Sequence, residues 1–357
     1  MTSHQSQHDD DYCIEPIASL EFDGAASCLV TVHYDQSLRV FATPFSKYGP
    51  ASAQLSSSRV VKHTEATTSM QRLPHIVAPH PTFSSCDNFL AFHNRIYFLN
   101  RFIHKNGKMS PALNLPDSAS NAQFFRNESF VIFSSKRAVN LNQLYIPKNC
   151  QQKWQQKPVF SWFFPDTVTA VTSINKHLSE IVAVSLSDRS IRVLDASIGT
   201  ECWKVDESLF GRKSAHCLAF SNTSACDTLP STVPLNFLGA SSMHDGGTIT
   251  LFDVRTAKAV SVLKGSHVNR RYKCNITFSP CMRYLATGSE SEGGAIMYDL
   301  RFHKNKQHVE IFESTTYEGK PIRDGVVTHV AFNPLYPQCC TASLGGALRF
   351  FTESSDK

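Results

Sequence analysis

Residues 266–273, SHVNRRYK, place two adjacent arginines beside a tyrosine in a segment that we expect to be a loop. Guanidinium groups form charge-assisted hydrogen bonds with carboxylates and phosphates, so Arg270, Arg271 and Tyr272 could bind an acidic peptide, a phosphoinositide or RNA. The alternative is an exposed loop whose arginines are simply solvated. The sequence leaves both interpretations open, and among the binding interpretations it favours contact with a protein.

Other residue types that carry chemistry do not gather into a known motif. The chain has no phosphate-binding P-loop, no GxGxxG turn, no HExxH zinc motif and no GxSxG nucleophile elbow. The glycine-rich stretches 245–248 and 292–294 each lie in a predicted turn between two strands, where glycine supplies the positive φ of a tight hairpin. We therefore predict no catalytic residue, no cofactor and no enzyme activity. A hydrolase whose carboxylates are brought together only by folding stays open as an alternative.

Histidine and cysteine are numerous but scattered. The 15 histidines form no cluster, and the 11 cysteines include no CxxC pair. Zinc sites and disulfide frameworks need regular spacing, so we predict neither a metal site nor a disulfide scaffold. Reduced thiols are typical of a reducing compartment, which predicts a cytoplasmic protein, with the nucleus as the alternative.

The composition argues against several classes of protein. Of the 357 residues, 41% are hydrophobic and 18% are charged, which suffices for a core and is too little charge for a disordered chain. The net charge of +5 is mild, so we predict no specific nucleic-acid partner. Residues 1–11 are polar and acidic, unlike a secretory signal, and no stretch of about 18 apolar residues predicts a transmembrane segment.

A strand–turn–strand pattern recurs seven times along the chain. Each copy is a short apolar strand, a polar turn and a second apolar strand, as in 181–195 (IVAVSLSDRSIRVLD) and 285–299 (LATGSESEGGAIMYD). The other copies are 29–41, 89–99, 130–141, 237–253 and 339–351. The second strands recur about every 52 residues, which predicts a repeat architecture.

Further strands flank several of these hairpins, so each repeat is predicted to hold four short antiparallel strands. The strands before a hairpin are 78–84, 168–174, 216–221, 274–279 and 327–333, and those after one are 200–205 and 258–263. The excess length falls into polar segments that we predict to be surface loops. These segments are 48–73, 105–121, 147–157, 222–234 and 301–320.

Several of these segments resemble WD40 repeats, notably 278–290 (FSPCMRYLATGSE) and 187–195 (SDRSIRVLD). The resemblance is strong over about residues 165–351 and weaker over 18–150. No repeat keeps the terminal Trp-Asp pair of the family, because the Trp position holds Phe41, Leu194, Phe252, Tyr298 or Phe351. The resemblance therefore implies an incomplete hydrogen-bond relay within the blades, and a stability that depends more on packing.

The last two repeats, residues 251–351, look similar to the C-terminal propeller of the family called WD-repeat-containing protein twenty-seven. That family is usually a two-propeller chain, whereas 357 residues leave room for one propeller. We predict an all-β fold: a single seven-bladed WD40 β-propeller over residues 12–351, closed by the N-terminal strand. Residues 1–11 are predicted to be a disordered N-terminal tail, and 352–357 a C-terminal tail.

Closure of the ring is predicted from the two ends of the propeller. Its first and last sheets must join, because open sheet edges invite unwanted pairing. Only six residues follow Phe351, too few for another strand. We therefore expect residues 12–17 (YCIEPI) to form the outer strand of the last blade beside 348–351, with 18–22 as the inner strand of the first blade.

The resemblance implies a non-catalytic scaffold that presents loops on one propeller face to protein partners within a multiprotein assembly. In WD40 proteins the loops that join the fourth strand to the first, and the second to the third, most often bind. The residues predicted on that face are Tyr34, Asp35, Arg189, His244, Asp245, His267, Arg270, Arg271, Tyr272, Glu290, Glu292 and Asp324.

Two alternative functions remain. A phosphoinositide-binding propeller at membranes would use the same arginines, although the Phe-Arg-Arg-Gly signature of such propellers is absent, since Asn269 and Tyr272 flank the pair here. A propeller-fold hydrolase is the less favoured third hypothesis, and it would show convergent carboxylates with perturbed pKa values.

Overall fold

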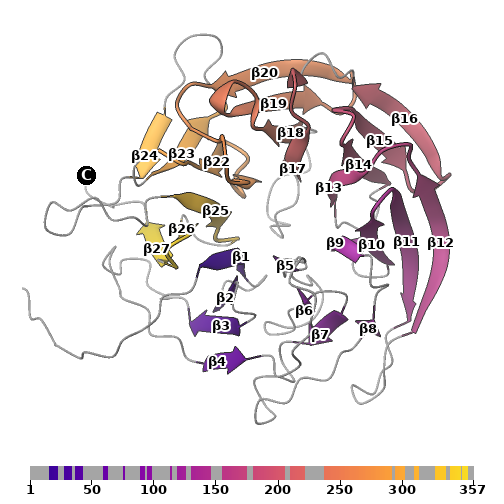
Figure 1. The fold of residues 1–357 in the computed structure, drawn as a ribbon, viewed down its shortest axis with the longest axis horizontal. Coiled ribbons are helices and arrows are strands. Elements are labelled where there is room, and N and C mark those ends of the chain that lie inside the picture. Colours follow the sequence, from indigo (N-terminus) through magenta and orange to yellow (C-terminus); the bar gives the residue numbers. More distant parts are fainter. Residues whose placement is uncertain are drawn as a thin grey trace, which may run out of the picture.

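The chain forms a ring of small antiparallel β-sheets in the computed structural model (Figure 1). The structure describes residues 16–22, 28–33, 37–42, 59–62, 75–76, 89–92, 95–98, 113–114, 119–125, 130–145, 155–174, 180–205, 210–221, 237–291, 294–301, 309–312, 326–334, 338–346 and 348–352. The described strands make six four-stranded sheets and one three-stranded sheet. In every sheet the strands follow one another in chain order, and the first strand lies nearest the centre of the ring. This arrangement is that of a β-propeller-like fold.

The first three sheets come from the N-terminal part of the chain. The first contains β1 (Ile17–Phe22), β2 (Cys28–His33), β3 (Ser37–Ala42) and β4 (Arg59–Lys62). The second contains β5 (His75–Ile76), β6 (Phe89–Phe92), β7 (Arg95–Phe98) and β8 (Leu113–Asn114). The third contains β9 (Ala119–Phe125), β10 (Phe130–Ser135), β11 (Ala138–Tyr145) and β12 (Gln155–Phe163).

The remaining four sheets come from the C-terminal part of the chain. The fourth contains β13 (Val168–Ser173), β14 (Ile181–Leu186), β15 (Ile191–Asp195) and β16 (Thr200–Val205). The fifth contains β17 (Ala215–Phe220), β18 (Phe237–Ser242), β19 (Thr248–Asp253) and β20 (Lys258–Lys264), with the 3-10 turn η2 (His244–Gly246) between β18 and β19. The sixth contains β21 (Ile276–Phe278), β22 (Tyr284–Gly288), β23 (Ala295–Asp299) and β24 (Val309–Phe312), and the seventh β25 (Val327–Phe332), β26 (Gln338–Ser343) and β27 (Leu348–Thr352).

The seven predicted hairpins are confirmed, each as the second and third strands of one sheet. The predicted outer strands 200–205 and 258–263 are confirmed as β16 and β20. In the second sheet the first strand is β5, whereas the predicted strand 78–84 lies outside the described residues, as does the predicted loop 222–234.

Four of the predicted loops were wrong in part, because each contains strand residues. Segment 48–73 contains β4, 105–121 contains β8 and the start of β9, 147–157 contains the start of β12, and 301–320 contains β24. Apart from β9, these are the fourth strands of their sheets, joined by backbone hydrogen bonds along one edge only. A strand at the rim does not need the alternating apolar residues by which inner strands are recognised.

Both ends of the predicted propeller differ slightly from expectation. Ile17, predicted in the closing strand, belongs to β1 and pairs with His33 of β2. Thr352, predicted to begin the C-terminal tail, is the last residue of β27. Residues 1–15 and 353–357 lie outside the described residues, so the pairing of 12–16 with β27 stays a prediction.

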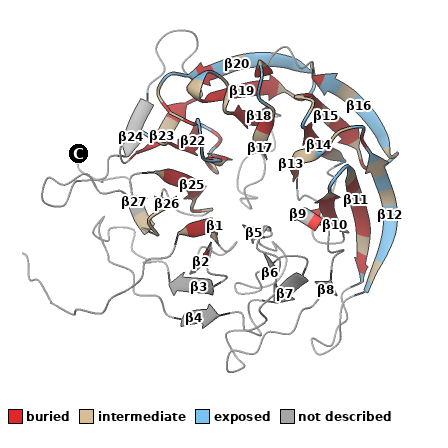
Figure 2. Cartoon of the chain, viewed as in Figure 1, coloured by how far each residue is buried: buried red, intermediate tan, exposed pale blue. Residues whose placement is uncertain are grey.

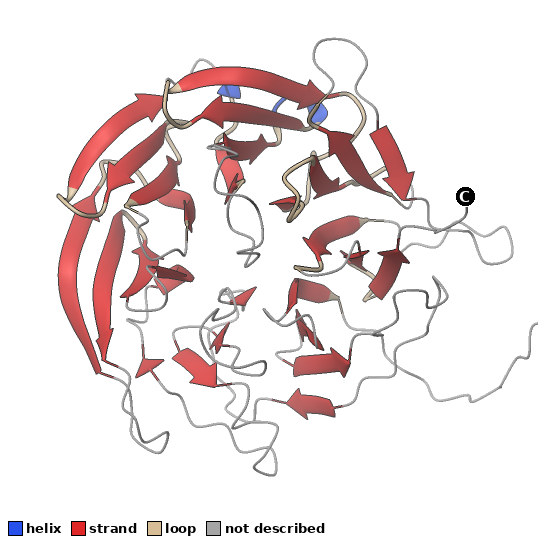
Figure 3. Ribbon diagram, turned by 180° about the vertical axis from the view of Figure 1, so that it is seen from behind, coloured by secondary structure: helices blue, strands red, loops and turns tan. Residues whose placement is uncertain are grey.

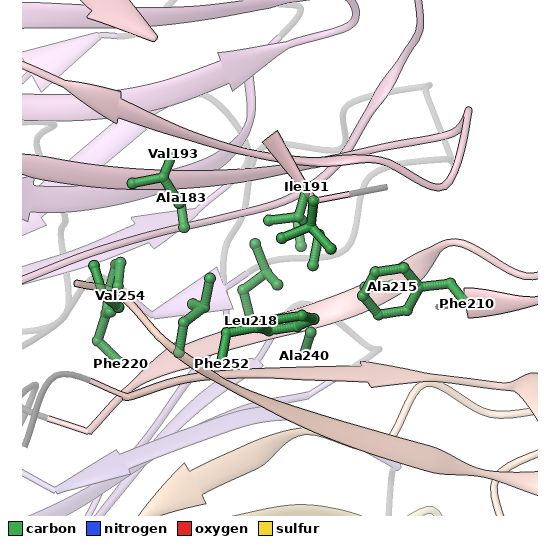
Figure 4. Close-up of a cluster of buried hydrophobic side chains, with 13 residues drawn as sticks. Ala183, Ile191, Val193, Phe210, Ala215, Leu218, Phe220, Ala240, Phe252 and Val254 are labelled. Carbon is green, nitrogen blue, oxygen red and sulfur yellow. The ribbon is translucent and has the colours of Figure 1, made fainter. Parts of the chain in front are cut away.

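The core lies between the sheets. Between the fourth and fifth sheets, Ile191 and Val193 of β15 pack with Phe220 of β17 and Phe252 of β19 (Figure 4). The other described interfaces repeat this pattern, and Ile17 and Leu29 of the first sheet share a cluster with Cys340 of the seventh. The middle strands β14 and β18 are almost wholly buried, whereas the outer strands β12, β16 and β20 are mainly exposed (Figure 2).

Polar side chains also link the innermost strands of neighbouring sheets. The Asn275 amide, just before β21, donates to the Val330 carbonyl (2.9 Å) and accepts from the Val330 N–H (2.8 Å) on β25. Gln123 of β9 bridges in the same way to the Val171 carbonyl (3.3 Å) and the Ser173 N–H (2.9 Å) of β13. An innermost strand has no further strand on its inner side, so these amides satisfy backbone groups that would otherwise lack a partner.

Candidate interaction surface

The loops of interest lie at one end of the sheets. In an antiparallel sheet, the second-to-third and fourth-to-first connections lie at the same end, and the other two kinds of turn lie at the opposite end. The described loops at the first end include residues 187–190, 210–214, 243–247, 265–275 and 289–291. They belong to the fourth, fifth and sixth sheets, which lie side by side in both views of the ring (Figures 1 and 3). We call this group of loops the upper face.

Arg189 connects the fourth sheet to the loop that enters the fifth. It lies in the β14–β15 turn with φ 75°, and its Nη1 donates to the Gly211 carbonyl at 2.6 Å. Gly211 has φ +55° and packs directly against the imidazole of His244, where a Cβ atom would collide with the ring. Arg189 and His244 are therefore held near each other through a glycine, and this contact has no signal in the sequence.

The β18–β19 turn is shaped by glycine, as predicted. Asp245 has a left-handed φ of 49°, and Gly246 and Gly247 follow with φ 82° and 129°. The Gly246 carbonyl accepts a hydrogen bond from the Asn269 N–H at 2.5 Å, which joins this turn to loop 265–275. A Cβ atom at Gly247 would come within 2.9 Å of the Asn269 nitrogen, so glycine permits this close approach. The corresponding stretch 292–294 lies outside the described residues except for Gly294.

Glu290 anchors the basic loop by binding backbone N–H groups of that loop. Its Oε1 accepts hydrogen bonds from the N–H groups of Arg270 (2.6 Å), Arg271 (2.5 Å) and Tyr272 (2.8 Å). The Glu290 N–H in turn donates to the Val268 carbonyl at 2.7 Å. Successive N–H groups that converge on one oxygen form an anion-binding concavity, or nest. A carboxylate of the sixth sheet thus fixes the loop, while the side chains of Arg270, Arg271 and Tyr272 stay exposed.

His267 does not lie on the exposed face, so its predicted role in partner contact was wrong. The residue is 2% exposed, and its Nδ1 lies 2.6 Å from the Tyr298 hydroxyl. This hydrogen bond ties the imidazole to β23, while the His267 Nε2 is buried without a hydrogen-bond partner among the described residues. His267 therefore lies beneath the loop, against Tyr298 of β23.

A second, half-buried histidine supports the same loop from below. His216 of β17 lies with its Nε2 3.0 Å from the Cys274 carbonyl and 3.2 Å from the Asn269 amide. The carbonyl contact places the proton on Nε2, so we assign the Asn269 amide oxygen, not its nitrogen, to the position facing the ring. Burial lowers the pKa of His216 to about 4, and burial together with the nearby His216 lowers that of His267 to about 4. Both rings are neutral at pH 7.

The upper face brings together most of the predicted interaction residues that the structure describes. His244, Asp245, Arg270, Arg271, Tyr272 and Glu290 meet at the junction of the fifth and sixth sheets, and Arg189 reaches them through Gly211. Tyr34, Asp35, Glu292 and Asp324 lie outside the described residues. Glu290 has a different role from that predicted, since its carboxylate binds the loop of its own chain.

No family model matches the chain. Over the described residues, no group of three or more His, Cys, Asp or Glu side chains is placed to hold a metal ion. In the same part of the chain, no helix is long and apolar enough to cross a membrane.

Proposed function

We propose that the chain is a single seven-bladed WD40 β-propeller that acts as a non-catalytic scaffold and binds protein partners through its upper face. Seven described hairpins, one in each sheet, support the blade number. The seventh sheet has three described strands, and we propose that residues 12–16 supply its fourth. This closes the ring without any further segment of chain.

The observation that carries the functional proposal is the way loop 265–275 is held. Its backbone is attached to the fifth sheet through Asn269 and to the sixth sheet through Glu290, while two arginines and a tyrosine point outward. A partner that binds this loop would not have to order it first, and the entropy cost of association is reduced accordingly. Arginine and tyrosine are also the side chains enriched at the energetic centres of protein interfaces.

Two cysteines of the described region are poor candidates for catalytic nucleophiles. Burial raises the pKa of the Cys217 thiol to about 11 and that of the Cys274 thiol to about 12. Both thiols therefore stay protonated at pH 7, whereas catalytic cysteines need a lowered pKa. A phosphoinositide-binding propeller is the second candidate, because exposed arginines would also contact lipid phosphates.

Affinity purification followed by mass spectrometry tests the proposal. The test variant is Arg270→Glu/Arg271→Glu, and the matched control is Lys258→Glu/Arg283→Glu, which reverses two exposed charges at the opposite end of the fifth and sixth sheets. We expect at least one wild-type partner to be lost from the test variant and kept by the control. Recovery of every partner by both variants would refute the assignment of the upper face.

A further inference from the structure

The exposed charge on the upper face is strongly one-sided. Together with Lys264 at the end of β20, the loops of the upper face contain seven lysines and arginines and three carboxylates. Arg189 is half-buried and donates to the Gly211 carbonyl, and the other six cationic side chains are exposed: Arg212, Lys213, Lys264, Arg270, Arg271 and Lys273. Of the three carboxylates, Asp188 accepts hydrogen bonds from Ser190, Glu290 is engaged by three backbone N–H groups, and Asp245 is exposed. The surface offered to a partner is therefore cationic.

These cations are not neutralised within the described chain. The ion pairs found among the described residues are Arg192–Glu201, His244–Asp245, Arg255–Asp253 and Arg301–Asp299, and none includes the six exposed cations. Arg270 is also oriented, because its side chain lies across Gly246, where a Cβ atom would stand 3.3 Å from the arginine Nε. An oriented, unpaired guanidinium can form bidentate hydrogen bonds with a carboxylate that arrives from outside.

Glu290 shows which chemistry fits this loop. A carboxylate oxygen already lies within 2.5–2.8 Å of three consecutive N–H groups there. The inner side of loop 270–272 binds a carboxylate of its own chain, and the outer side presents two guanidinium groups of the same residues. The six exposed cations come from two separate stretches of chain, 212–213 and 264–273, a distribution that suits a ligand carrying several negative charges along its length.

We propose that the upper face binds an acidic segment of a partner protein, rich in Asp and Glu, and that Arg270 and Arg271 are its main contacts. This inference rests on the proposed scaffold function and adds the chemistry of the partner. A protein is favoured over a membrane, because Tyr272, 42% exposed, is the one large apolar side chain exposed in these described loops. Stable membrane contact usually combines basic residues with several inserted apolar groups.

The test measures direct binding of a defined peptide to the purified full-length chain. A fluorescein-labelled peptide of about twelve glutamates is titrated by fluorescence anisotropy at about 50 mM salt, beside a glutamine peptide of equal length. We expect binding of the glutamate peptide alone, weakened about tenfold or more in Arg270→Glu/Arg271→Glu and by less than about threefold in Lys258→Glu/Arg283→Glu. Matching urea-unfolding midpoints of the three proteins confirm that the variants are folded.

Several results would overturn this inference. They are no binding by the wild-type chain, equal weakening in both variants, or equal affinity for the glutamate and glutamine peptides. Flotation with vesicles that contain a phosphoinositide, lost in Arg270→Glu/Arg271→Glu, without peptide binding would assign the surface to membranes instead. If partners are lost from the test variant in the affinity purification but the glutamate peptide does not bind, the scaffold function stands and the acidic-segment inference fails.

Discussion

Replacing Asn275 by alanine should destabilise the fold, because it removes hydrogen bonds between the innermost strands of two neighbouring sheets. The Asn275 amide makes two hydrogen bonds to the backbone of Val330, at 2.9 and 2.8 Å, and joins the sixth sheet to the seventh. Val330 is 1% exposed. In Asn275→Ala both the N–H and the carbonyl of Val330 lose this partner in a partly buried setting, while the methyl group that remains replaces neither hydrogen bond.

The size of the effect follows from these two backbone groups. A buried donor or acceptor left without a partner costs about 1–3 kcal/mol, so two groups with partial access of water should cost about 2–4 kcal/mol. The matched control is Asn140→Ala, because the Asn140 side chain accepts one hydrogen bond, from the Ser161 hydroxyl at 2.9 Å, in an exposed position. We expect the control to change stability by less than about 0.5–1 kcal/mol.

Equilibrium urea unfolding, followed by circular dichroism, provides the measurement. Asn275→Ala should lower the midpoint with an unchanged m value, because the extent of surface exposed on unfolding stays the same. A loss of less than about 0.5 kcal/mol, or a loss equal to that of Asn140→Ala, would refute the view that side-chain amides complete the innermost strands.

Three further perturbations test the fold. The pKa values of His216, His267 and His329 lie at about 4 in the folded chain against 6.5 for an unperturbed histidine, so unfolding takes up protons and stability falls as the pH drops below about 6.5. The loss should be about 2 kcal/mol for each histidine at pH 5. Burial raises the pKa of Glu21 to about 7, so protonation of Glu21 stabilises the folded chain at pH 5 and offsets the effect of about one histidine. Urea unfolding should therefore give a lower free energy of unfolding at pH 5 than at pH 7. A higher value at pH 5 would contradict the burial of these rings. Removal of residues 1–16 should lower the melting temperature while removal of 1–10 should not, and equal melting temperatures would disprove the closing strand. Gly288→Ala should cost about 1–3 kcal/mol in urea unfolding, because its Cβ would collide with the Val327 carbonyl of the next sheet, and wild-type stability would show that the sheets can separate there.

The periodic part of the fold could be predicted from the sequence, because its signal is local. The hairpin 181–195 alternates apolar and polar residues around a polar turn, and β14 and β15 appear where this alternation places them. The rim strands β4 and β24 gave no such signal, since only one edge of each pairs within its sheet. Position in the sheet, not propensity, makes these segments strands.

The sequence predicted which residues lie on the candidate surface, but it did not predict the contacts that those residues make. Counting strands placed Arg270, Arg271, Tyr272 and Glu290 on one face, and the structure brings them together. The role of Glu290 depends on the fifth and sixth sheets lying side by side, which no spacing along the chain encodes. His267 was misplaced for the same reason, since a histidine in a polar loop looks exposed until the tyrosine that covers it is known.

Amide hydrogen exchange at residues 270–272 tests most directly whether the loop is held ready for a partner. The N–H groups of Arg270, Arg271 and Tyr272 should exchange at least about tenfold more slowly than in an unstructured peptide, although their side chains are exposed. In Glu290→Ala this protection should be lost at these three amides and kept in β18 and β19. Exchange of the three amides at the rate of an unstructured peptide in the wild-type chain would contradict a preorganised interaction surface.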